Sequence, residues 1–458
     1  MGPAELTTAA LEASRADGCV VVLTDTSEVN LRWANNTMTT NGHTTTRSFS
    51  VISVVDGTDG PAVGVVSGNG VDLDEVCAAV VASEQAAHQS GLARDAAPLL
   101  EGTGDEDFDT PAAATEIGVF AGLIDGLAAA FGRDELLYGF AEHRLETTWL
   151  ASSTGLHRRW VQPTGTVELN GKVAADLTRS AWTGAYTADF SDLDFAALLA
   201  EVRRRLSWST RQVTLPARRY ETILPPSAVA DLMLDMVWSM DGRSAHEGRS
   251  AFAASGEGSG GTRLGERLTG LPLTLSTDPT APGLQTSPFL TTTASGDSVS
   301  VFDNGAPMHR VDWLREGTVH ALTYPRGAAQ ELGGQYTPPP ENLMLTGGSS
   351  ASTDDLVAAT ERGLLLTCLW YIREVDPVSL LLTGLTRDGV YLIEKGEVAG
   401  QVNNFRFNES PIDLIRRATE VGATERTLCR EWKDWFTRTA MPPIRIPDFN
   451  MSSVSQAS

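Results

Sequence analysis

Short runs of β-branched and apolar residues, separated by turn-forming residues, dominate the first part of the chain. Residues 19–23, 49–55 and 62–67 form three such runs, with Gly and Asp between the second and the third. Runs of this kind predict β-strands joined by tight turns. Asp72 then stands where it could cap a helix, and apolar residues recur at helical spacing over 73–80. The pattern therefore predicts strands of one sheet followed by a helix.

Helical and strand-like patterns continue to alternate over the following residues. Helical spacing returns at 113–131 and at 190–206, and strand-like alternation fills 144–172 between them. We expect these elements to form an N-terminal α/β domain over residues 1–220, with helices packed on a mixed sheet.

The rest of the chain is mostly strand-like. Pro and Ser suit the first turn of a helix predicted at 225–240. After it, short apolar runs are separated by Gly, Pro, Asn and Asp, and only 354–362 and 411–421 have helical spacing. We expect a β-rich, barrel-like C-terminal domain around a central helix over 221–450, and a disordered tail over 451–458. The fold class is therefore α+β.

Composition excludes several classes of protein. The 458 residues include 58 Asp and Glu against 35 Lys and Arg, a net charge of −23. Such an acidic surface repels nucleic acid and anionic lipid, and it favours solubility or a basic peptide or partner. Four cysteines are scattered singly, the start of the chain lacks a signal peptide, and no apolar run is long enough for a membrane helix. We therefore expect a cytoplasmic protein that binds neither nucleic acid nor membranes.

Two local motifs suggest a metal or a nucleotide but lack the rest of their pattern. His246 and Glu247 resemble the start of a zinc-peptidase HExxH or HExxxH motif. Ser250 and Ala251 stand where the second His would be, so a ligand is missing. The stretch 256–261 contains GxGxxG, but no convincing strand precedes it. We expect a loop histidine and a mobile glycine-rich loop, which could still serve as a lid or a peptide-contacting flap.

Other candidate residues are dispersed. His309 and His320 lie 11 residues apart in a predicted strand-turn-strand region and could face each other, but we expect structural or solvent roles for both. An aromatic and basic cluster near the end of the chain is either a binding patch or a set of packing anchors; its members are Arg430, Trp432, Trp435 and Arg438. These motifs assign no catalytic, cofactor-binding or metal-binding residue.

Taken together and in order, several segments resemble the TldD/PmbA family, and specifically its TldE branch. At residues 151–155 the resemblance is to the family's asparagine-serine-x-glycine turn, with the Asn replaced. The other matching segments are 54–57, 224–226, 248–252, 287–289, 303–305, 386–390, 394–398, 404–407 and 441–446. The resemblance covers nearly the full chain.

The resemblance implies a cytoplasmic two-subunit zinc peptidase. In such a complex the TldD subunit carries the zinc on an HExxxH helix with a later Cys, and the TldE subunit has no metal. The family's metal helix corresponds here to residues 227–240, which contain no His. Cys429 lies near the position of the late Cys, but a zinc site takes three or four protein ligands. We therefore expect no cofactor, metal or catalytic residue in this chain, and zinc in a TldD-type partner.

The expected function is that of a metal-free subunit in a heterodimeric peptidase that processes or degrades unfolded peptides. Exposed strand edges can hold an extended peptide through main-chain hydrogen bonds with little sequence preference. The alternative is a homo-oligomeric protein that binds peptides or small molecules, or a biosynthetic enzyme that reuses the fold. A neighbouring reading frame with an intact HExxxH motif would favour the heterodimer.

Overall fold

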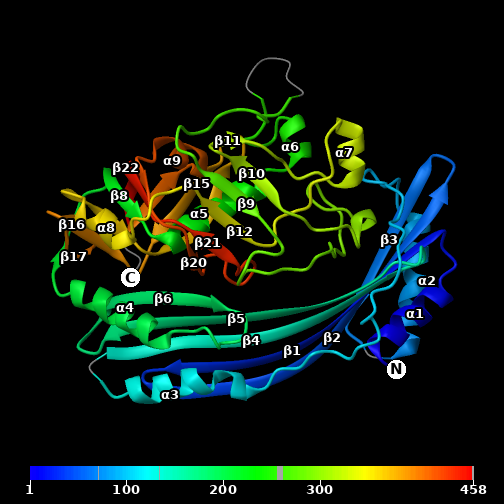
Figure 1. Ribbon diagram of the computed structural model, residues 1–458, viewed down its shortest axis with the longest axis horizontal. Helices are drawn as coiled ribbons and strands as arrows, with labels where there is room; N and C mark the ends of the chain where they lie inside the picture. Colours follow the sequence, from blue (N-terminus) through cyan, green and yellow to red (C-terminus); the bar gives the residue numbers. More distant parts are fainter. Residues whose placement is uncertain (71, 134, 255–260, 456–458) are drawn as a thin grey trace.

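A computed structural model describes residues 1–70, 72–133, 135–254 and 261–455. Within these residues, helices accompany three β-sheets (Figure 1). The predicted α+β class is confirmed. No helix of the described part of the chain is long and apolar enough to cross a membrane.

The first sheet is antiparallel and curls into a half-barrel (Figure 1). Its order is β3-β2-β1-β4-β5-β6. The strands are β1 (Gly18–Ala34), β2 (Thr37–Gly57), β3 (Gly60–Gly68), β4 (Glu135–Ser152), β5 (His157–Val173) and β6 (Asp176–Thr187). The mixed sheet expected here is wrong, because hairpins join most of these strands and reverse the chain each time. At the β1–β2 turn, Asn35 and Asn36 both have positive φ, as a two-residue hairpin requires.

Both faces of the half-barrel are covered. Val21 and Leu23 face α1 (Pro3–Ala13) and α2 (Leu73–Gln89), whereas the alternate residues Val20 and Val22 pack against Phe289 and Phe302 from the second part of the chain. This double burial explains why 19–23 reads as a continuous apolar run. The face that α1 and α2 cover also packs against two further helices, α3 (Ala121–Ala130) and α4 (Phe195–Trp208). A short 3-10 helix, η1 (Ile117–Phe120), directly precedes α3.

The second part of the chain contains two mixed sheets. The larger follows the path β14-β15-β18-β22-β8-β13-β16-β17-β7, with β19 paired to β22. Its strands are β7 (Gln212–Val213), β8 (Arg219–Leu224), β13 (Arg362–Leu366), β14 (Leu369–Asp376), β15 (Leu381–Thr386), β16 (Val390–Glu394), β17 (Glu397–Val402), β18 (Phe405–Glu409), β19 (Glu420–Val421) and β22 (Ile444–Val454). The smaller has the order β11-β10-β9-β12-β21-β20. Its strands are β9 (Thr274–Thr277), β10 (Val311–Arg315), β11 (Thr318–Val319), β12 (Leu343–Thr346), β20 (Glu425–Thr427) and β21 (Thr439–Met441).

Helix α5 (Pro226–Trp238) joins these two sheets. Ten of its 13 residues are buried, and eight of these share one hydrophobic cluster with side chains of both sheets, such as Leu364 and Leu345. Two open sheets therefore replace the expected barrel, because packing on α5 and not strand pairing connects them. The remaining helical elements are α6 (Gly242–His246), α7 (Arg326–Leu332), α8 (Thr353–Ala358), α9 (Pro411–Arg417) and η2 (Val301–Asp303).

The predicted disordered tail, 451–458, includes residues that belong to a strand. Strand β22 continues to Val454, and Met451 is buried in the core opposite Phe407 of β18. Apolar burial therefore fixes the first residues of this segment. Residues 456–458 lie outside the described residues.

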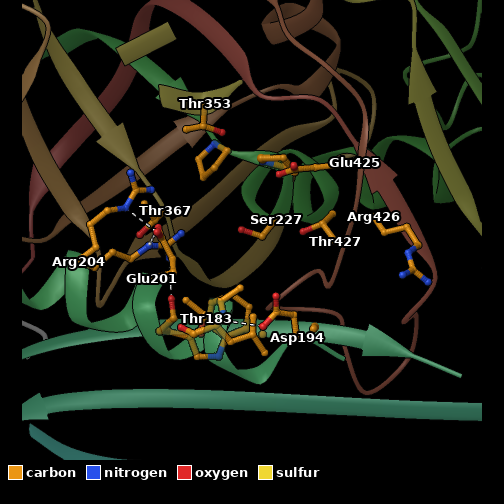
Figure 2. A pocket seen from close by; sticks show the side chains of 18 of the residues that line it. Thr183, Asp194, Glu201, Arg204, Ser227, Thr353, Thr367, Glu425, Arg426 and Thr427 are labelled. Atoms are coloured by element: carbon orange, nitrogen blue, oxygen red, sulfur yellow. Dashed lines mark hydrogen bonds and ion pairs between the residues drawn. The ribbon is translucent and has the colours of Figure 1, made fainter. Parts of the chain in front are cut away.

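The half-barrel and the smaller mixed sheet each leave a strand edge open. β6 ends the half-barrel and β20 ends the smaller mixed sheet. Figure 2 shows Thr183 of β6 and Thr427 of β20 on facing sides of the space between these sheets.

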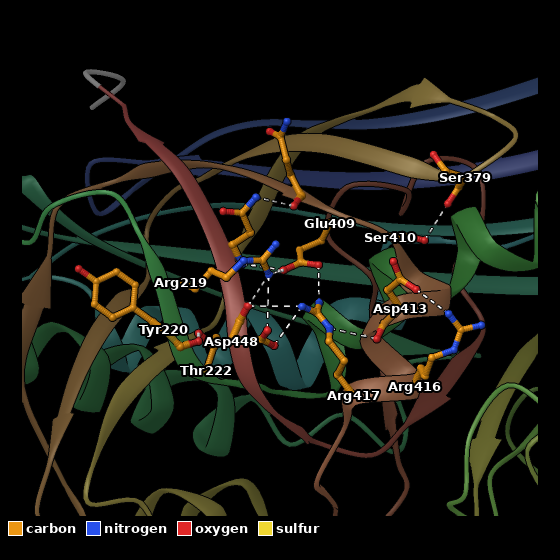
Figure 3. Close-up of polar contacts among 12 residues, drawn as sticks. Arg219, Tyr220, Thr222, Ser379, Glu409, Ser410, Asp413, Arg416, Arg417 and Asp448 are labelled. Carbon is orange, nitrogen blue, oxygen red and sulfur yellow. Dashed lines mark hydrogen bonds and ion pairs between the residues drawn. The ribbon is translucent and has the colours of Figure 1, made fainter.

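A buried carboxylate ties α9 to three strands (Figure 3). The Glu409 side chain is 4% exposed, and its burial raises its pKa. Arg417 of α9 donates to it at 2.6 Å, the backbone N–H of Asn450 at 2.6 Å, and Arg219 of β8 approaches it at 3.7 Å. A second carboxylate, Asp448, also accepts from Arg417, at 3.0 Å.

We expect Arg417→Met to lower the free energy of unfolding by about 2 to 3 kcal/mol, because Glu409 then loses its nearest cation while Arg219 remains. Urea unfolding monitored by circular dichroism measures this loss. The matched control is Arg416→Met on the same helix, whose exposed pair with Asp413 should contribute less than about 1 kcal/mol. Equal losses in the two variants would contradict this account of Glu409.

Candidate functional site

Helix α5 places two carboxyl groups one turn apart. Asp231 is 1% exposed, and its Oδ1 accepts the backbone N–H of Glu431 at 2.9 Å. Its Oδ2 has no hydrogen-bond partner among the described residues. Asp235 Oδ2 accepts the indole N–H of Trp432 at 3.2 Å. Burial raises the pKa of Asp231 well above its usual range and that of Asp235 to about 7.

The segment 428–438, which follows β20, supplies the partners of these carboxyl groups. Cys429 is buried, and its Sγ donates to the carbonyl of Phe436 at 2.8 Å. Burial raises the pKa of this thiol. The Arg430 guanidinium lies 4.4 Å from the ring of Trp370 and 5.5 Å from that of Trp182, and it reaches Asp388 at 3.4 Å. Arg430 is therefore held between two indole rings from different sheets.

Segment 428–438 also attaches α5 to the half-barrel. Lys433 pairs with Glu168 of β5 at 3.1 Å, and Arg438 donates to the carbonyl of Pro163 at 2.9 Å. Trp432 packs edge-on against Trp238 at 5.1 Å. Trp435, in contrast, is 82% exposed. Of the aromatic and basic cluster noted in the sequence, Arg430, Trp432 and Arg438 are thus packing anchors, and Trp435 alone is open to solvent.

A cleft of about 650 Å³ lies between the half-barrel and the second part of the chain (Figure 2). The edge strands β6 and β20 line it on facing sides. The N-terminal turns of α5 and α8 and one side of α4 complete the walls. Figure 2 shows Ser227, at the start of α5, beside Thr427 of β20. The cleft therefore combines two strand edges with hydroxyl groups.

Two ion pairs cross this cleft. Arg426 of β20 contacts Asp192, in the loop after β6, at 2.6 Å. Arg204 of α4 contacts Asp354 of α8 at 2.7 Å and also binds Glu201. These contacts connect elements of the half-barrel to elements of the second part, and they brace the walls at two points.

A smaller cavity of about 350 Å³ lies beside segment 428–438. Its walls include Trp160 and Arg144 of the half-barrel, Phe289, and the exposed Trp435. This smaller cavity lies where segment 428–438 meets the half-barrel, whereas the cleft is lined by β20, which precedes that segment.

The His246–Glu247 motif lies outside the cleft. His246 ends α6 with its ring 6.2 Å from that of Tyr324, and Glu247 pairs with Arg94 and Arg249. This Glu is therefore engaged by cations. Residues 256–260 of the glycine-rich stretch lie outside the described residues.

His309 and His320 do come together. Both line a cavity of about 460 Å³, where His309 lies 6.4 Å from Tyr336, ring to ring. The nearby Asp312 is already paired with Arg310 and Arg315. The two histidines thus share a cavity, and their structural or solvent roles stay a prediction.

The folding pattern has known counterparts. A family profile described as "PmbA/TldA metallopeptidase C-terminal domain" matches residues 217–453, and one described as "PmbA/TldA metallopeptidase domain 1" matches residues 19–87. The chain belongs to the PmbA/TldD metallopeptidase family. No curated protein sequence matches it significantly.

Solved structures of similar fold cover almost the whole chain. TldE from Thermococcus kodakarensis has a TM-score of 0.78 at 14% identity, over 97% of this chain and 98% of that one. A proposed modulator of DNA gyrase from Bacteroides thetaiotaomicron has a TM-score of 0.75 at 14% identity, over 98% of both chains. A proposed modulator of a DNA gyrase from Thermotoga maritima reaches 0.73 at 16% identity, over 94% of this chain and 95% of that one. At these identities the likeness shows the fold alone.

The family name implies a metal, and the chemistry of the side chains around α5 decides whether this PmbA/TldD chain could hold one. Helix α5 carries two carboxyl groups and no imidazole. Oδ1 of Asp231 already accepts a backbone N–H, and the Cys429 thiol already donates to a carbonyl. No group of three or more His, Cys, Asp or Glu side chains within the described ranges is arranged to hold a metal ion. The residues at this place therefore do not fit the metal.

Sequence reasoning missed both the carboxyl pair on α5 and the cleft. The i, i+4 spacing of Asp231 and Asp235 in an otherwise apolar helix was a detectable signal. The cleft gave no local signal, because its ion pairs join residues that are far apart in the chain, such as Arg426 and Asp192.

We expect Asp235→Asn to change how stability depends on pH. Since burial raises the folded-state pKa of Asp235 to about 7 from an ordinary 3.8, its stabilising contribution is complete below pH 4 and is lost as the pH rises through 7. The Asn side chain of the variant does not ionise, so the variant does not lose stability in this way. Its unfolding free energy relative to the wild type should therefore rise between pH 4 and pH 7, by on the order of 2 kcal/mol after allowance for partial exposure.

Urea unfolding at intervals from pH 4 to pH 8 measures this difference. The matched control is Asp59→Asn, in the exposed turn between β2 and β3, which should follow the wild type throughout. A difference between Asp235→Asn and the wild type that stays constant with pH would rule out a raised pKa at Asp235.

Proposed function

We propose that this chain is the metal-free subunit of a TldD/TldE-type peptidase and that it holds an extended peptide in the cleft between β6 and β20. One observation carries the first part. Helix α5, which the resemblance equates with the family's metal helix, offers Asp231 and Asp235 without a His, and Asp231 and Cys429 have partners of their own. The zinc that the reaction requires then comes from a TldD-type partner.

The arrangement of the cleft supports the second part. Among the described strands, β6 pairs only with β5, and β20 pairs only with β21. Each strand therefore keeps one edge whose main-chain groups are not used in a ladder. An extended peptide that enters this cleft can form main-chain hydrogen bonds along the open edge of one of these strands, which gives affinity with little dependence on sequence.

Folded proteins are excluded from such a site for a geometric reason. The two bridging contacts, Arg426 with Asp192 and Arg204 with Asp354, hold the walls together. A chain must therefore be locally extended to lie along β20. This fits a subunit that presents unfolded peptides to a catalytic partner.

Co-expression with a TldD-type subunit should give a stable heterodimer that cleaves unfolded peptides, with zinc in the partner only. Size-exclusion chromatography, elemental analysis of each purified subunit and a peptidase assay test this. Stoichiometric zinc in this chain alone, or full activity in the partner alone, would overturn the proposal. A stable homo-oligomer that does not bind the partner would favour the alternative of an independent binding protein.

Blocking the cleft should reduce peptide binding without affecting assembly. In the Thr427→Trp variant an indole occupies the edge of β20, and we expect the affinity for an unfolded peptide to fall at least tenfold by fluorescence anisotropy. Thr45→Trp, on an exposed stretch of β2, is the control for a large surface substitution. Unchanged affinity in the Thr427→Trp heterodimer would show that peptides bind elsewhere.

A further inference from the structure

We propose that the cleft between β6 and β20 prefers peptides with a cationic side chain and that Glu425 is the residue that pairs with that side chain. This inference rests on the proposed function, since it assigns a substrate class to the same cleft. It makes Glu425 a specificity-determining residue with no part in the chemistry of cleavage.

The charges on the walls are unbalanced. Among the described residues that line the cleft there are five carboxylates and three guanidinium groups, a difference of two negative charges; they are Asp192, Asp194, Glu201, Asp354, Glu425, Arg204, Arg205 and Arg426. All three arginines are engaged, Arg426 by Asp192, Arg204 by Glu201 and Asp354, and Arg205 by Glu201. Each arginine among the described residues of the walls is therefore already paired with a carboxylate other than Glu425.

Glu425 differs from the other four carboxylates. Asp194 caps α4 by accepting the N–H of Ala197 at 2.9 Å, and the other three are in the ion pairs just described. The Glu425 carboxylate has no ion pair and no hydrogen bond with any described residue. Glu425 is exposed to solvent, and the partial burial of its carboxylate in the cleft raises its pKa with no cation to oppose that effect. An ionised Glu425 in this cleft thus lacks a compensating positive charge.

The position of Glu425 suits a side-chain contact with a bound peptide. It lies on the edge strand β20, where successive side chains point to opposite sides. Figure 2 shows Glu425 directed towards the part of the cleft near Thr353, and Arg426 directed away from it. A peptide strand along β20 would pass the Glu425 carboxylate, and a lysine ammonium or an arginine guanidinium at that position would supply the missing charge.

A charged residue on an open strand edge also discourages edge-to-edge aggregation. That structural role predicts no discrimination between peptides, and any charge would serve it. Reversal of the charge at position 425 therefore separates the two roles, because Glu425→Lys keeps a charge on the edge.

The test uses the full-length chain and two labelled extended peptides that differ at one central position, Lys in one and Gln in the other. Fluorescence anisotropy should show that the wild type binds the Lys peptide about fivefold more tightly, the ratio expected for one partly exposed ion pair, with a smaller ratio at high salt. Glu425→Gln should abolish the ratio and leave the affinity for the Gln peptide unchanged. Glu425→Lys should bind the Lys peptide less tightly than the Gln peptide.

The control Glu397→Gln removes an exposed carboxylate from β17, outside the cleft, and should keep the wild-type ratio. Equal wild-type binding of the two peptides, or an unchanged ratio in Glu425→Gln, would overturn the charge preference and leave the proposed peptide binding intact. Binding of neither peptide would overturn both.

Discussion

The burial of α5 is the constraint on which the rest of the structure depends. This helix joins two mixed sheets that do not pair with each other, so its side chains must be apolar nearly all round. Asp231 lies within that apolar surface and is buried with it. A buried carboxyl group needs a hydrogen-bond partner, and the backbone N–H of Glu431 provides one. The position of segment 428–438 thus follows from α5.

Segment 428–438 in turn determines how the half-barrel meets the second part of the chain. Arg430 enters between Trp182 and Trp370, and Lys433 reaches Glu168 on β5. With segment 428–438 fixed on the half-barrel, β20, which immediately precedes it, lies opposite β6. The cleft is therefore a consequence of a packing requirement, and no cluster of catalytic side chains is needed to create it.

How much of this follows from the sequence depends on whether the signal is local. The apolar run at 19–23 and the helical spacing at 225–240 were enough to place β1 and α5, because burial on both sides leaves an unmistakable pattern. The second half of β1 alternates buried apolar residues with half-buried polar ones such as Glu28 and Asn30, and a reading based on continuous apolar runs does not find this strand pattern. The cleft could not be predicted, because Asp192 and Arg426 are separated by most of the second part of the chain and meet only through tertiary packing.

The charge state of the α5 carboxyl groups bears on what this place in the fold can do. Burial raises the pKa of Asp231 and so favours its protonated form, while Arg430 beside it forms an ion pair with Asp388. A cluster with that balance can be buried without a further counter-ion. Metal ligation requires the opposite, an ionised carboxylate or thiolate with free lone pairs. Burial raises the pKa of the Cys429 thiol as well, and its hydrogen is donated to Phe436. The same packing that fixes segment 428–438 thus favours the protonated forms of Asp231 and Cys429, which supports the proposal that this subunit binds and presents a peptide while a partner carries the metal.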